Sequence, residues 1–128
     1  MKPDIVSRAD IEELMTAFYS KAIPDEVIGH FFTEVMHLHL EKHLPVITDF
    51  WESILLNKPA LYKSNAMQPH LHMHQLSPLK KEHFDRWLML FHHTVDHMFQ
   101  GEIAFKAKER ATSIATVMQI KIAQLKES

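Results

Sequence analysis

The stretch His43-Leu44-Pro45-Val46-Ile47-Thr48-Asp49-Phe50-Trp51 decides how this chain is interpreted. Within it and just beyond, five residues recur at helical spacing and therefore share one side of a helix. They are His43, Ile47, Phe50, Trp51 and Ile54. That side is apolar except at one end. The pattern predicts a helix that presents a single imidazole to an apolar pocket.

Two helical segments precede this stretch. Ser7 begins the first, and Asp10 three positions later forms a partial capping box with it. Apolar residues then follow helical spacing as far as Ala22. A break at Pro24-Asp25 leads into a short helix over residues 27–36.

The helix that contains the opening stretch spans roughly residues 38–56. We expect its regular part to start close to His43, because Pro45 is tolerated only near a first turn. Helical periodicity returns over residues 79–100, ends at Gly101, and resumes over residues 102–125. No alternating strand pattern occurs, so the predicted fold class is all-α.

A long segment without helical periodicity, residues 58–79, separates these helices. Loops of this length inside a small domain are usually functional or disordered. The segment carries three prolines and three alternating histidines: Pro59, Pro69, Pro78, His70, His72 and His74. We predict a loop with at most one short helix just after Pro69.

The amino-acid composition limits the classes of function that this chain can have. A chain of 128 residues with 46% apolar content predicts one soluble domain, residues 1–128. The net charge of −2 indicates neither nucleic-acid nor membrane-surface binding. Cysteine is absent, which excludes disulfides, thiolate metal sites and covalent haem attachment through a Cys-x-x-Cys-His motif. Neither a signal peptide nor a membrane span is visible, so the cytoplasm is the expected compartment.

Two histidines from different segments could serve one cofactor. At most two of the three histidines at 70, 72 and 74 can face the same pocket, in a strand or in a helix. His70 is preferred because it follows Pro69, a natural first helical position. A solvated loop or an incidental zinc site is the alternative. His43 and His70 together supply what a haem iron needs above and below it.

The remaining histidines carry weaker signals. His93 and His97 have zinc-ligand spacing, and a non-haem metal-binding helical bundle that adds Asp96 or Glu102 is the alternative function. The paired Glu-x-x-His motifs of di-iron bundles are missing from the sequence. We expect the other histidines on the surface: His30, His37, His39, His83 and His92. From its spacing, Tyr19 is expected at the rim of the core with its hydroxyl in water.

From about Ile11 to Ile122, the chain resembles the group III truncated haemoglobins of bacteria. The matching features, in order, are Phe18-Tyr19, His43-Leu44-Pro45 with Phe50-Trp51, His70-Leu71, Glu82-His83-Phe84-Asp85-Arg86-Trp87-Leu88 with Phe91, and Arg110-Ala111-Thr112-Ser113-Ile114-Ala115. The resemblance implies a truncated globin: a two-over-two helical sandwich whose proximal segment is largely unwound.

The resemblance also implies a haem b site. In it, His70 is the proximal iron ligand, and His43 is the distal histidine and a candidate second ligand. Tyr19 and Trp87 donate hydrogen bonds on the distal side. Ile47 and Phe50 line the haem face, and Trp51 packs behind them.

The implied function is reversible binding of O₂, NO, CO or cyanide at five- or six-coordinate iron. Two distal donors predict slow oxygen release, which suits ligand capture and NO or oxidative-stress chemistry better than delivery. NO dioxygenase or peroxidase-like turnover would depend on an external reductase. We expect a monomer or a weak dimer that binds diatomic gases, with no nucleic-acid or membrane partner.

Overall fold

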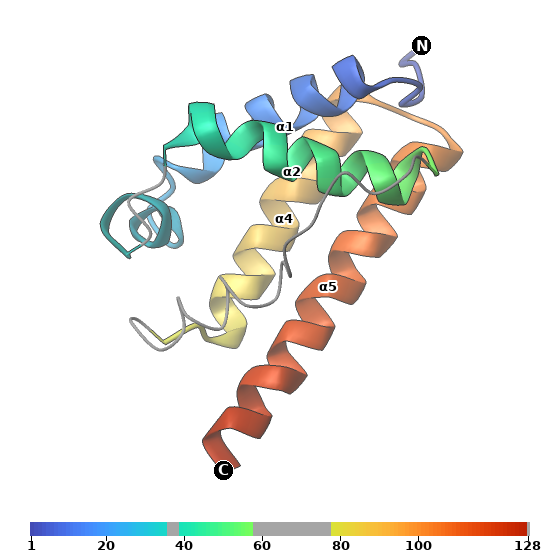
Figure 1. Ribbon diagram of the computed structural model, residues 1–128. Coiled ribbons are helices and arrows are strands. Elements are labelled where there is room, and N and C mark those ends of the chain that lie inside the picture. The colour runs from blue at the N-terminus through green and yellow to red at the C-terminus, as the bar shows by residue number, and fades with distance from the viewer. Residues whose placement is uncertain (36–38, 58–77, 128) are drawn as a thin grey trace.

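The computed structural model describes residues 1–35, 39–57 and 78–127. Four α-helices dominate it, and the described residues include no strand. Figure 1 shows α1 (Arg8–Ala22) and α2 (Leu40–Leu55) crossing over α4 (Lys81–Met98) and α5 (Glu102–Glu127). Helix α1 packs against α2 and α4, and α4 packs against α5. The all-α prediction and the two-over-two arrangement are confirmed.

Helix α1 begins where its sequence predicts. The Ser7 hydroxyl accepts a hydrogen bond from the Asp10 backbone N–H at 3.3 Å. The Asp10 carboxylate reaches back to the Val6 N–H at 2.9 Å. These bonds satisfy backbone donors that a helix N-terminus leaves free. The buried side of the helix follows the predicted spacing: Ile11, Leu14, Met15, Phe18 and Ala22.

The connection after α1 differs from the expected short helix over residues 27–36. Turns lead into two α-helical residues, Gly29 and His30, and then a π-helix, η1 (Phe31–Val35), so the helix starts later than expected and is mostly π-helical. The Asp25 carboxylate accepts from the backbone N–H groups of Val27 at 2.9 Å and Ile28 at 3.1 Å. This is the hydrogen-bond pattern of a helix N-cap, and it satisfies backbone donors at the start of the helical residues.

Helix α2 starts earlier than expected. It begins at Leu40, so Pro45 lies beyond its first turn, and the expected start near His43 is wrong. Pro45 has no N–H to donate to the carbonyl of Glu41. Because Glu41 is exposed, water can bond to that carbonyl, and the proline is tolerated.

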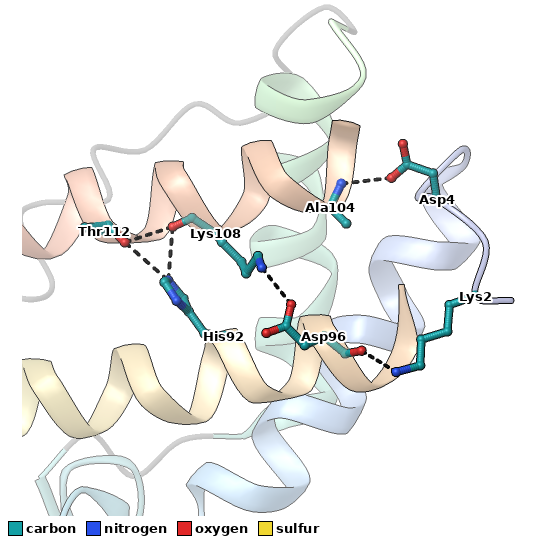
Figure 2. A network of polar contacts seen from close by, with 7 residues as sticks. All are labelled: Lys2, Asp4, His92, Asp96, Ala104, Lys108 and Thr112. Carbon is teal, nitrogen blue, oxygen red and sulfur yellow. Dashed lines mark hydrogen bonds and ion pairs between the residues drawn. The ribbon is translucent and has the colours of Figure 1, made fainter. Parts of the chain in front are cut away.

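The N-terminal segment is fastened to the corner between α4 and α5. The Asp4 carboxylate accepts hydrogen bonds from the Ile103 N–H at 3.0 Å and the Ala104 N–H at 2.8 Å, and Figure 2 shows the second of these. Gly101, at φ +138°, makes this corner. A Cβ at Gly101 would lie 2.5 Å from the Asp4 carboxylate carbon, so only glycine leaves room for the carboxylate.

Aromatic side chains from three helices form the centre of the core. The ring of Phe91 stacks on that of Trp51, with 5.2 Å between their centroids. Phe18 meets Phe91 edge-on at 5.5 Å. Trp51 is buried, as expected for a residue that packs behind the pocket. These contacts fix α1, α2 and α4 against one another.

Residues 58–77 lie outside the described residues, and they include most of the predicted loop and the segment that was expected to be unwound. None of the described helices is long and apolar enough to cross a lipid bilayer.

Candidate functional site

The side chains of two hydrogen-bond donors both contact the ring of Phe18. The Phe18 ring centroid is 5.1 Å from that of Tyr19 and 6.2 Å from that of Trp87. Tyr19 belongs to α1 and Trp87 to α4, and both are half-buried. Within the described part of the chain, neither the Tyr19 hydroxyl nor the Trp87 indole N–H has a hydrogen-bond partner. Both donors are therefore available to a bound molecule.

Tyr19 lies at the rim of the core, as its spacing predicts. Its ring meets Phe18 on one side and Phe32 at 5.6 Å on the other. Burial raises the pKa of the Tyr19 phenol far above its ordinary value of 10.0. The side chain therefore remains a neutral O–H donor under all physiological conditions.

Helix α2 presents two neighbouring rows of side chains. Its buried row is Thr48, Trp51 and Leu55. Thr48 was not part of the predicted apolar side, yet its side chain is fully buried. The predicted residues Ile47, Phe50 and Ile54 are instead only half-buried. They form an apolar row beside the core.

His43 stands at the N-terminal end of that half-buried row. It is itself half-buried, and burial lowers the pKa of its imidazole below the ordinary 6.5. The ring is therefore neutral near pH 7. A neutral imidazole keeps a lone pair, which is the form that binds a metal ion.

A cavity of about 240 Å³ lies between the start of α4 and the end of α5. Its apolar lining includes Leu79, Phe84 and Ile122. Phe84 precedes Trp87 by three residues on α4, so the two share a side of the helix. Helical periodicity indicated Phe84 as a core residue, but nothing in the sequence predicted this cavity.

The described side chains fit the flat, apolar cofactor expected from the sequence. A half-buried apolar row, a neutral imidazole and two unpaired donors suit a macrocycle that is apolar over most of its surface. The expected proximal ligand, His70, lies outside the described residues, as do His72 and His74. Its role stays a prediction.

The alternative metal site finds no support. No group of three histidine, aspartate or glutamate side chains that could hold an ion occurs in the described ranges, which include all four proposed ligands. His93 and His97 are exposed on α4. The Asp96 carboxylate pairs instead with the Lys108 ammonium at 2.7 Å (Figure 2).

Three histidines expected on the surface make structural contacts. His92 lies 3.2 Å from both the Lys108 carbonyl and the Thr112 hydroxyl, and so links α4 to α5 (Figure 2). His83 Nδ1 accepts a hydrogen bond from the Lys80 N–H at 2.9 Å, and its ring lies 6.2 Å from that of His30. Their surface assignment is wrong because each is half-buried. His39 is exposed as expected, and His37 lies outside the described residues.

Comparisons with known proteins agree with this geometry. Residues 4–123 match the family model described as bacterial-like globin. The group 3 truncated hemoglobin ctb of Campylobacter jejuni is 29% identical over 122 residues, which cover 93% of each chain. The crystal structure of the group III truncated hemoglobin from Campylobacter jejuni aligns with a TM-score of 0.83 at 27% identity, over 95% of both chains.

Proposed function

We propose, from the premise that this chain belongs to the bacterial-like globin family and so binds haem, that it captures diatomic gases and holds them for chemistry. The observation that supports capture over delivery is the pair of unpaired donors, Tyr19 and Trp87, whose rings both contact Phe18.

Each donor slows the escape of a polar ligand. A hydrogen bond to a charged acceptor shielded from water contributes about 1–3 kcal/mol. About 1.4 kcal/mol corresponds to a tenfold change in affinity. Tyr19 and Trp87 together therefore favour long residence of a ligand on which negative charge accumulates, such as O₂, over one that stays apolar, such as CO.

The cofactor in this proposal is haem b, held without a covalent bond, since the chain has no cysteine to form one. When bound, haem supplies an iron centre that takes a small ligand. His70 would hold the iron, with His43 as a candidate second ligand. Ile47 and Phe50 would line the face of the macrocycle.

The proposed biochemical context is NO or oxidative-stress chemistry in the cytoplasm. Sustained turnover as an NO dioxygenase or a peroxidase-like enzyme would draw electrons from an external reductase. The protein acts as one globin domain over residues 1–128, as a monomer or a weak dimer.

Oxygen dissociation rates test this proposal. Tyr19→Phe and Trp87→Phe each remove one donor and keep an aromatic ring, so each should speed release about tenfold or more. Trp51→Phe is the matched control, because Trp51 belongs to the same aromatic core but packs behind the half-buried row of α2. Unchanged rates in both donor variants would rule out capture by these residues.

A further inference from the structure

We propose that the ion pair between Asp25 and Arg86 sets the relative position of Tyr19 and Trp87, which makes both charged groups positioning residues for the bound gas. The inference rests on the proposed function, in which Tyr19 and Trp87 are the distal donors.

The ion pair is directional, and its carboxylate side is buried. Arg86 donates from Nε at 3.0 Å and from Nη2 at 2.7 Å to the same oxygen, Oδ1 of Asp25. The Asp25 side chain is 4% exposed and that of Arg86 is 38% exposed. Two hydrogen bonds from a planar guanidinium fix orientation as well as distance.

Asp25 is built into the segment that holds Tyr19. Its second oxygen, Oδ2, accepts from the N–H groups of Val27 and Ile28 and shapes the turn after α1. That turn leads to Phe32, whose ring lies 5.6 Å from the Tyr19 ring. A displacement of the Asp25 carboxylate would therefore move the residues against which Tyr19 packs.

Arg86 is the residue directly before Trp87 on α4. Because neighbouring residues of a helix are joined rigidly, a tie at Arg86 fixes both the rotation and the axial position of Trp87. Ring contacts also connect the two donors, because Phe18 meets Trp87 edge-on and Phe91 contacts both of these rings. The ion pair adds two charge-assisted hydrogen bonds to these apolar contacts.

The charge state suits this role. Hydrogen bonding from Arg86 lowers the pKa of Asp25 against the opposing effect of burial, and the Ile28 and Val27 N–H groups add to the lowering. The carboxylate is therefore ionised near neutral pH, which is the form that accepts both hydrogen bonds from Arg86.

A matched set of variants tests the inference in haem-loaded protein. Asp25→Asn removes the charge, and Arg86→Lys keeps the charge but loses the planar fork. Asp85→Asn is the control, because Asp85 is 56% exposed and pairs only with the 78% exposed Lys81 on the same helix.

Three readouts apply to the ferrous protein. These are the infrared C–O stretching band of the CO complex, the indole N–H resonance of Trp87 in that complex, and the oxygen dissociation rate. Both Asp25→Asn and Arg86→Lys should shift the band and the resonance and should speed oxygen release about twofold or more. Asp85→Asn should leave all three unchanged.

A double-mutant cycle separates positioning from general destabilisation. In a Tyr19→Phe, Trp87→Phe background, Asp25→Asn should have no further effect on oxygen release, because the groups it positions are gone. An effect of full size in that background would overturn the inference and leave the proposed function intact.

The two ideas fail in different ways. If Tyr19→Phe and Trp87→Phe leave oxygen release unchanged, the proposed function fails. The Trp87 resonance then decides the positioning role. If neither Asp25→Asn nor Arg86→Lys moves this resonance, the positioning role is overturned, whatever the oxygen dissociation rates are.

Discussion

Asp4 Oδ1 accepts a hydrogen bond from the backbone N–H of Ala104 at 2.8 Å, across 100 residues of sequence. The other oxygen, Oδ2, accepts from the Ile103 N–H at 3.0 Å. A helix N-terminus exposes N–H groups without partners and carries partial positive charge. The Asp4 carboxylate accepts hydrogen bonds from N–H groups at the start of α5 and places a negative charge beside its partial positive charge. The N-terminal segment is therefore part of the globin fold.

Asp4→Ala should lower the free energy of unfolding by about 0.5–2 kcal/mol, the range for loss of a helix cap. Burial opposes ionisation of Asp4, but the N–H groups of Ile103, Ala104 and Ile5 lower its pKa below the ordinary 3.8. A lowered folded pKa means that the stabilisation is complete above 3.8 and is lost as the pH falls through the lowered value.

Urea unfolding of the wild type and of Asp4→Ala over a pH series measures this effect. The gap between the two should be widest near neutrality and should narrow in acid. Asp85→Asn, which removes an exposed carboxylate, should show no such gap. A gap of constant size across the series would mean that the charge of Asp4 is irrelevant.

Thr48→Val should raise stability by about 1 kcal/mol. The Thr48 hydroxyl is fully buried and has no hydrogen-bond partner among the described residues, so valine removes a desolvated polar atom and keeps the shape. Thr94→Val is the matched control. Thr94 is equally buried, but its hydroxyl donates to the Leu90 carbonyl at 2.7 Å.

The midpoint temperature of thermal unfolding should rise for Thr48→Val and fall for Thr94→Val, and Thr94→Val should lose about 1 kcal/mol of stability. A loss of stability in Thr48→Val would contradict the account, since it would mean that the hydroxyl has a partner in solution.

Acid should weaken the N-terminus of α4 through His83. Burial lowers the pKa of His83 below 6.5, His30 and Lys80 act in the same direction, and Glu82 opposes them. The neutral ring is the form whose Nδ1 accepts from the Lys80 N–H. Because the folded pKa is lowered, stability is full above 6.5 and decreases as the pH falls through the folded value.

His83→Asn keeps a hydrogen-bond acceptor and removes the titration. It should leave stability at about pH 7.5 almost unchanged and should reduce the loss seen at about pH 5.5. His93→Asn, at an exposed position on the same helix, should keep the wild-type pH dependence. The mechanism is wrong if His93→Asn and His83→Asn behave alike.

His70→Ala should abolish stable haem uptake, because the proposal makes this imidazole the proximal ligand. Haem uptake is measured by titrating the protein with hemin and recording the Soret absorbance of the oxidised, reduced and CO-bound forms. His72→Ala and His74→Ala are the controls and should bind haem as the wild type does. If either control loses haem while His70→Ala keeps it, the proximal ligand is another residue.

Local patterns predicted the helices well. The Ser7 cap and the buried side of α1 were predictable because cap and helix depend on neighbours three or four residues apart. The row from Ile47 to Ile54 on α2 was also predicted, although its members are half-buried beside the core and not at its centre. The start of α2 was misjudged, because the rule for Pro45 ignores solvent at the Glu41 carbonyl.

Contacts between distant segments could not be predicted in this way. Nothing near Asp4 in sequence marks it as a cap for α5, and nothing near Asp25 marks Arg86 as its partner. The role of His83 was missed because histidine is an uncommon helix cap. For Tyr19, spacing indicated only a place at the rim of the core, and the resemblance to a globin family suggested the roles of Tyr19 and Trp87.

The contact of Phe18 with both Tyr19 and Trp87 limits how this protein can diversify. A substitution that alters the volume of that one ring displaces both donors together, so selection cannot adjust them independently at position 18. A descendant with a different gas preference would have to change the tyrosine or the tryptophan itself and conserve the phenylalanine.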